Sequence, residues 1–234
     1  MIQAIFFDWF GTLAHYDPPR EQLQSQALKE LGFEVSAGDL RRSLVESDRE
    51  FYAESAAVSS RDMTREDRQA MYIRHQERIL ARAGVPVPAD MLPQVISRTR
   101  ELYRDMRFAL FDDVLATLRA LKERNLIIGL LTNLRQDIDA ICRELGLESY
   151  VDFTVTSAEV GAEKPNPPVF LAALERASVT ADMAIHVGDQ YEVDVAGARR
   201  LGIAPVLLDR NNVYPDITDC PRIRSLIEIT AYIS

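Results

Sequence analysis

Short apolar runs of strand length recur along this chain, and most of them are apolar at every position. Such runs are typical of strands covered on both faces, as in parallel sheets. In the second half they alternate with segments of helical periodicity, a pattern that indicates βαβ units. The sequence therefore favours an α/β fold built on a doubly wound parallel sheet. We predict strands at Ile2–Phe7, Leu126–Leu131, Phe153–Thr156, Ala184–Val187 and Pro205–Leu208.

The segments between these strands carry apolar residues at helical spacing. The second of them stops at Gly146, where a glycine is favoured because it adopts the left-handed conformation that ends helices. We predict helices at about Asp113–Arg124 and Asp137–Leu145, a third that starts near Pro167 and a fourth that ends at Leu201.

Residues 17–108 interrupt this alternation and contain no convincing strand. Apolar stripes of helical period lie around Leu28 and around Ile96, and Thr64 with Asp67 resembles a helix-starting capping box. We predict a block of about four helices inserted after the first strand. The expected domains are an α/β core of residues 1–16 and 109–234 and an all-helical domain of residues 17–108.

Composition excludes several classes of function. The 234 residues carry a net charge of −9, which repels a nucleic-acid backbone. No uncharged apolar run has the length of a membrane span, and the first apolar run lacks a basic leader. The two cysteines lie in no paired motif, which favours a reducing compartment. We expect a cytoplasmic protein, monomer or homodimer, with no nucleic-acid or membrane partner.

Polar residues follow four of the predicted strands. Because parallel strands point their carboxyl ends at one edge of a sheet, these residues should converge there. Carboxylates are hard ligands that suit Mg²⁺, while Thr, Asn and Lys donate to phosphoryl oxygens. The four groups are Asp8, Thr132 with Asn133, Glu163 with Lys164 and Pro165, and Gly188 with Asp189 and Asp194.

With these motifs in this order, the chain resembles the haloacid dehalogenase (HAD) superfamily, in the branch with a helical cap after the first strand. The resemblance spans the whole core. It implies a Rossmann-like core with the first strand central, and a cap over residues 17–108 that closes on the site and selects the substrate. The matching motifs are Asp8-Trp9-Phe10-Gly11-Thr12, Leu131-Thr132-Asn133, Lys164-Pro165, and Gly188-Asp189 with Asp194.

The resemblance also implies catalytic roles. Asp8 would be the nucleophile, and its attack would give an aspartyl intermediate. Thr132 and Asn133 would bind the transferring group. Lys164 would bind the same group, neutralise developing charge and restrain Asp8.

A magnesium site is implied as well. Asp8 and Asp189 would bind Mg²⁺, and Asp194 would support the site directly or through water. The main-chain carbonyl of Phe10 would be a further ligand. Trp9, beside the site, would either pack in the core or contact the substrate.

Phe10 departs from the family pattern. Similar phosphatases usually carry Asp there, which protonates the leaving group and then activates water, a contribution worth about 10²–10⁴-fold. A phosphatase without this acid should be slow, selective for good leaving groups, or dependent on another acid. His15 and Asp17 are candidates, although solvated loop residues are the plainer interpretation.

Three functions remain open. Gly188, Asp189 and Asp194 favour a Mg²⁺-dependent phosphatase acting on a small phosphorylated metabolite. A 2-haloacid dehalogenase or other carbon-centred hydrolase is one alternative, since such dehalogenases carry an aromatic residue at the place of Phe10, although they typically lack the Gly-Asp pair. The third is a weakly active protein retained for binding or regulation.

Other polar residues receive structural interpretations. Phosphonate hydrolases of the superfamily need a cap lysine, but Lys29 is expected to be solvated. His186, in an apolar strand, is expected to be a hydrogen-bonded core residue, and His75 a surface residue. The arginines from Arg98 to Arg107 are expected on a solvated helix face rather than in an anion clamp.

Overall fold

A computed structural model describes residues 1–57 and 64–233 of the chain. Contacts between Cα atoms divide it into two compact units. The core unit comprises Met1–His15 and Ala109–Ser234, and the helical unit comprises Tyr16–Phe108.

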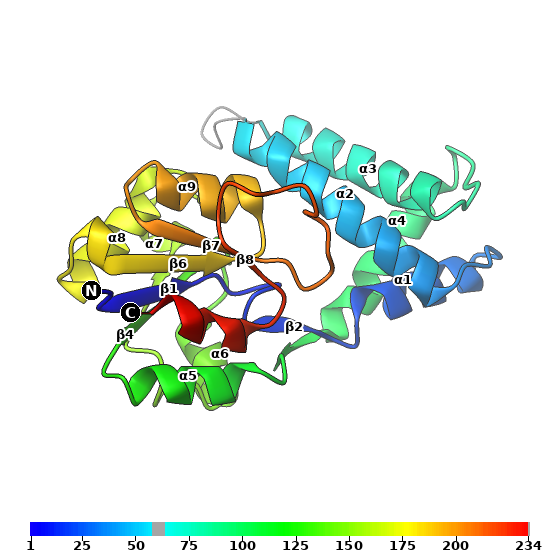
Figure 1. Ribbon diagram of the computed structural model, residues 1–234. Coiled ribbons are helices and arrows are strands. Elements are labelled where there is room, and N and C mark those ends of the chain that lie inside the picture. Colours follow the sequence, from blue (N-terminus) through cyan, green and yellow to red (C-terminus); the bar gives the residue numbers. More distant parts are fainter. Residues whose placement is uncertain (58–63, 234) are drawn as a thin grey trace. The chain divides into compact units, whose positions relative to one another are not determined.

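The core unit contains a six-stranded sheet in the order β5-β4-β1-β6-β7-β8, with every strand pair parallel. From the central β1 the chain continues outward through β4 and β5 in one direction, and through β6, β7 and β8 in the other. Helices α5 and α6 lie on one side of the sheet and α8 and α9 on the other (Figure 1). The predicted doubly wound parallel sheet is therefore confirmed. The strands of this sheet are β1 (Ala4–Phe7), β4 (Ile127–Thr132), β5 (Phe153–Thr156), β6 (Ala184–Gly188), β7 (Ala204–Leu208) and β8 (Arg222–Ile223). The helical segments of the core unit are α5 (Val114–Lys122), α6 (Ile138–Glu144), α7 (Ser157–Val160), α8 (Pro167–Ala177), η2 (Ala181–Met183), η3 (Tyr191–Val195), α9 (Ala196–Arg199) and η4 (Leu226–Tyr232).

Burial on both faces explains why the strands are apolar throughout. All four residues of β1 have no exposed surface. Side chains alternate along a strand, so Phe6 packs in one cluster with Phe170 of α8, while Ile5 and Phe7 face the other way. The core thus fixes β1 from both sides and leaves its carboxyl end, at Asp8, as the first position free for function.

Two features of the sheets were not predicted. Strand β8 is only two residues long and carries no periodicity. A separate two-stranded sheet pairs β2 (Ala14–Asp17) with β3 (Arg107–Leu110), where the chain passes between the two units. These short strands include polar residues, so they lack the apolar signal of the core strands.

The helical unit packs around its own apolar cluster, which includes Leu28, Leu40 and Ile79, all without exposed surface. The predicted capping box is present, since Thr64 accepts from the Asp67 main chain and Asp67 accepts from the Thr64 main chain. The helical segments of this unit are α1 (Arg20–Glu30), α2 (Ala37–Ala57), α3 (Arg65–Arg82), α4 (Leu92–Leu102) and η1 (Tyr103–Asp105).

A buried polar network joins three helices of this unit. Arg20 donates to Asp48 over 2.8 Å, and His75 Nε2 lies 3.1 Å from the other oxygen of the same carboxylate. The expectation that His75 is a surface residue is wrong, because its side chain is 5% exposed and its ring packs against Phe51. The charged neighbours of His75 in the sequence concealed that it faces α2.

Lys29 and the arginines from Arg98 to Arg107 lie at the surface of this unit, as expected from the sequence. Lys29 is exposed on α1. Arg98 pairs with Glu30 and Glu101, and the Arg100 guanidinium stacks over the Tyr72 ring. The arginines are thus partnered at the surface by acids and by an aromatic ring.

Of the helices in the described ranges, none combines the length and the apolar character that crossing a membrane requires. Cys142 and Cys220 are both free thiols.

We predict that Asp48 stabilises the helical unit far more than its neighbour Glu46 does. Asp48→Ala leaves Arg20 without its carboxylate in a largely buried position, which should cost about 2–4 kcal/mol of unfolding free energy. Glu46 is 63% exposed and lies 3.7 Å from Arg82, so Glu46→Ala should cost less than about 0.5 kcal/mol. Urea unfolding followed by circular dichroism measures both. Equal shifts would contradict the prediction.

Candidate active site

Asp8 continues directly from the end of β1. Its main-chain N–H donates to the Val187 carbonyl over 2.9 Å, which extends the ladder between β1 and β6 by one residue. The backbone of Asp8 is therefore held by the sheet, and its side chain projects at the edge where the strands end. Next along the chain, the main-chain N–H groups of Leu13 and Ala14 both donate to the Trp9 carbonyl, which closes the turn that follows.

Lys164 joins two of the predicted acids. Its Nζ lies 2.6 Å from Asp8 Oδ1 and 2.7 Å from Asp194 Oδ1, and its side chain is 1% exposed. Burial opposes a charged ammonium, but the two carboxylates outweigh it and raise the pKa of Lys164 well above its usual range. Lys164 is thus a permanent cation between two acids that lie 186 positions apart in the chain.

Asn133 holds the backbone of Lys164. Its Oδ1 accepts from the Lys164 main-chain N–H over 2.8 Å, and its Nδ2 donates to the Lys164 carbonyl over 3.1 Å. The adjacent Thr132, at the end of β4, accepts from the Leu134 main-chain N–H and keeps its own hydroxyl proton available. Asn133 therefore positions the lysine, and Thr132 places a hydroxyl at the end of β4.

Asp194 lies on the turn η3 and is fully paired. Its Oδ1 accepts from Lys164 and lies 3.1 Å from His186 Nε2, and its Oδ2 accepts from the Gln190 main-chain N–H. Burial raises the pKa of Asp194, but Lys164 and His186 outweigh burial and hold that pKa well below its usual range. Asp194 is therefore ionised at neutral pH.

His186 is the buried histidine that the sequence predicted as a hydrogen-bonded core residue, and the structure confirms this. Burial lowers its pKa, so the ring is neutral at pH 7. Because Asp194 is the acceptor, the single ring proton belongs on Nε2. The same ring lies nearly perpendicular to the Phe170 ring, with 5.2 Å between the two centroids.

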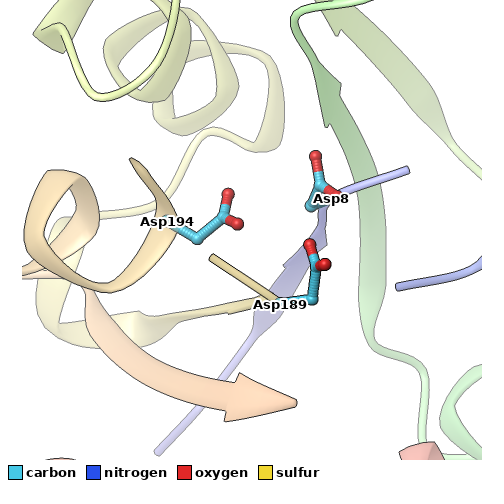
Figure 2. Close-up of side chains that lie close together, drawn as sticks. All are labelled: Asp8, Asp189 and Asp194. Atoms are coloured by element: carbon cyan, nitrogen blue, oxygen red, sulfur yellow. The ribbon is translucent and has the colours of Figure 1, made fainter. Parts of the chain in front are cut away.

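Asp189 completes a group of three acids. One carboxylate oxygen from each of Asp8, Asp189 and Asp194 lies within 4.8 Å of the others, and Figure 2 shows their side chains gathered together. Burial, followed by the charges of Asp8 and Asp194, raises the pKa of Asp189 well above its usual value. Burial also raises the pKa of Asp8 to about 6, against the opposing effect of Lys164. Three carboxylates facing one ammonium leave an excess of negative charge.

Two glycines permit this close packing. A Cβ at Gly188 would lie 2.2 Å from Asp194 Cγ. A Cβ at Gly11 would lie 2.3 Å from Asp189 Oδ2, and Gly11 also has a φ of +85°, which side chains disfavour. The glycines in both motifs are therefore required by the approach of the acids.

The remaining predicted residues lie in the turn after Asp8. Trp9 is fully buried and Phe10 is half-buried. The two alternative acids lie further along, where the His15 ring packs on Phe111 and Asp17 is exposed. Phe10 contributes no titratable group, and its carbonyl remains a predicted metal ligand.

One residue that contacts these acids, and a second residue behind it, were not predicted from the sequence. The Gln190 side chain donates from Nε2 to Asp189 Oδ2 over 2.8 Å, and the Tyr214 hydroxyl lies 3.2 Å from Gln190 Oε1. Gln190 adjoins a predicted metal ligand, which was a usable signal. Tyr214 belongs to the loop after β7, and no motif marks it.

The chain was also compared with known proteins. The family model for haloacid dehalogenase-like hydrolases matches residues 2–202. A ribulose-1,5-bisphosphate 5-phosphatase of Halopiger xanaduensis is 31% identical, over 89% of this chain and 85% of the relative. A glyceraldehyde 3-phosphate phosphatase of Methanopyrus kandleri is 30% identical, over 93% and 88%.

The fold has a solved counterpart in a HAD-hydrolase of Bacillus subtilis bound to magnesium. It is 18% identical with a TM-score of 0.69, and the match covers 100% of this chain and 99% of that one. The family model spans most of the chain, and both relatives match along nearly their whole length. This protein is therefore a hydrolase enzyme of the haloacid dehalogenase-like family.

Proposed function

We propose that this enzyme is a Mg²⁺-dependent phosphatase that hydrolyses small phosphate esters through Asp8. The observation that carries the proposal is the buried Lys164 ammonium, paired with Asp8 and Asp194 within a group of three carboxylates. This arrangement supports an ionised nucleophile beside a fixed positive charge. Those are the two requirements for attack on a negatively charged phosphoryl group.

The proposed reaction has two displacements. A carboxylate oxygen of Asp8 attacks phosphorus, the bond between phosphorus and the ester oxygen breaks, and the alcohol leaves with a proton taken from water. A water molecule then attacks phosphorus in the aspartyl phosphate, which releases phosphate and restores the Asp8 carboxylate. Lys164 neutralises the charge on the transferring oxygens, and the Thr132 hydroxyl donates a hydrogen bond to them.

The donor set fits Mg²⁺. Asp8, Asp189 and Asp194 supply hard oxygen ligands, and the excess of carboxylates over ammonium calls for a cation. The Phe10 carbonyl would complete the protein ligands. When bound, Mg²⁺ would neutralise the phosphoryl oxygens and allow them to approach Asp8.

The names of the relatives support a substrate class. Ribulose 1,5-bisphosphate and glyceraldehyde 3-phosphate are both small sugars that carry a phosphate on a terminal carbon. We propose a phosphorylated metabolite of this kind. The predicted role of Asn133 in binding the substrate, and that of residues 17–108 as a cap that selects it, belong to the same proposal. Of the two predicted alternatives for Trp9, its full burial favours packing in the core over contact with the substrate.

We predict that hydrolysis of a panel of sugar phosphates requires Mg²⁺ and disappears in Asp8→Asn. The nucleophile is lost in this variant while the shape of the side chain is kept. Asp182→Asn is the matched control and should leave turnover unchanged. Asp182 is exposed and lies just before the start of β6, whereas the predicted site follows the end of that strand. The measurement is phosphate release with Mg²⁺ and with chelator.

Two results of that panel would overturn the proposal. Halide release from 2-haloacids in the presence of chelator would favour a dehalogenase. Absence of turnover on every ester, combined with tight binding of some of them, would favour a binding or regulatory protein.

We predict that Phe10→Asp changes the dependence on the leaving group. Without an acid at position 10, kcat/KM of the wild-type enzyme should fall steeply as the pKa of the leaving alcohol rises. An added Asp should raise kcat/KM for alkyl phosphates by about 10–10³-fold and leave that for 4-nitrophenyl phosphate nearly unchanged, since nitrophenolate needs no proton. Phe10→Leu, which adds no proton donor, should keep the wild-type slope. An equal change for both substrates would contradict this prediction.

A further inference from the structure

We propose that Gln190 and Tyr214 act as a relay that orients Asp189 for binding a divalent cation. The inference rests on the metal site of the proposed function, and it names two positioning residues beyond the motif residues. Neither would contact the substrate. They act through the carboxylate of Asp189.

Gln190 engages one oxygen of Asp189. Its Nε2 donates to Asp189 Oδ2 over 2.8 Å. The same oxygen lies closest to Gly11, since a Cβ built there would be 2.3 Å from Oδ2 and 3.1 Å from Oδ1. Oδ2 thus has an amide donor and lies against the Gly11 backbone, while Oδ1 accepts no hydrogen bond from the described residues, and we assign Oδ1 to the cation. A carboxylate with one fixed oxygen is a pre-oriented ligand.

Tyr214 decides which end of the Gln190 amide faces Asp189. The Tyr214 oxygen lies 3.4 Å from the Tyr191 main-chain nitrogen, from which it accepts, so its own proton is directed to Gln190 Oε1 at 3.2 Å. Reversing the amide would place its oxygen against a carboxylate oxygen and its N–H groups toward the tyrosine. The hydroxyl therefore selects the orientation in which Nε2 donates to Asp189.

The loop that carries Tyr214 is itself anchored. Asp209, directly after β7 and 2% exposed, accepts from the main-chain N–H groups of Val213 and Tyr214 over 2.7 and 3.0 Å. Arg222 of β8 donates to the same carboxylate over 3.0 Å. The relay thus runs from β7 and β8, through Tyr214 and Gln190, to Asp189.

The test is a calorimetric titration with Mn²⁺, used as the probe for the divalent site in the full chain without substrate. Gln190→Ala should weaken Mn²⁺ binding about 10–100-fold, as is typical when the partner of a metal ligand is removed. Tyr214→Phe keeps the buried ring and should also weaken binding. In the Gln190→Ala background, Tyr214→Phe should cause no further loss, because the hydroxyl acts only through the amide.

Tyr191→Phe is the matched control. Its hydroxyl lies 2.6 Å from Asp219 and 3.2 Å from Arg199, away from the relay, while its main-chain N–H is retained. This variant should bind Mn²⁺ as the wild type does. Thermal unfolding of each variant shows that the fold is kept.

Three results would overturn the relay. If Gln190→Ala binds Mn²⁺ with wild-type affinity, the link from Gln190 to Asp189 is excluded. If Tyr214→Phe causes the same loss of affinity in the wild-type chain and in Gln190→Ala, the link from Tyr214 to Gln190 is excluded. Absence of Mn²⁺ binding by the wild-type chain removes the premise. Phosphate release from the ester panel is a separate measurement, so a failed relay with intact Mn²⁺ binding and turnover leaves the proposed phosphatase standing.

Discussion

The buried ammonium of Lys164 is the interaction on which the rest of the site depends. Removing an ammonium from water costs several kcal/mol, and here this cost is offset by two carboxylates at 2.6 and 2.7 Å. Asn133 fixes the backbone of the same lysine from both sides. The Lys164 ammonium therefore joins the end of β1 to the turn η3, while Asn133 ties the end of β4 to the lysine backbone, and displacing β1 or η3 would separate buried charges.

This charge arrangement leaves the site incomplete by itself. Lys164 compensates one of the two carboxylates that it contacts, and Asp189 has a Gln190 amide as its donor rather than a cation. Burial is the main cause of the raised pKa of both Asp8 and Asp189, and the charges of neighbouring carboxylates add to it. The fold maintains the crowding because Gly11 and Gly188 admit the carboxylates and the sheet fixes their backbones. Such locally unfavourable packing is expected where a ligand supplies the missing charge.

Much of the sheet and of the site could be predicted from the sequence, because a few physical rules hold for most proteins. Fully buried strands read as apolar runs, and parallel strands bring their carboxyl ends together, so the convergence of Asp8, Lys164 and Asp194 followed from the order of the motifs. The relay from Tyr214 could not be found in this way, because it depends on the path of a loop. His75 was misplaced for a similar reason, since its burial depends on packing between α2 and α3 and not on its neighbours in sequence.

Acids in such a site often both hold charge and transfer protons, and Phe10 can do neither. The chain retains the charged groups that would bind a phosphoryl group and hold a cation, but position 10 offers no group that moves a proton. A carboxylate at position 10 would add proton transfer and also another negative charge close in the chain to Asp8, whose pKa is already raised by burial. An apolar ring avoids that repulsion. Phe10 thus leaves the site without an acid at this position and also without a fourth negative charge near Asp8.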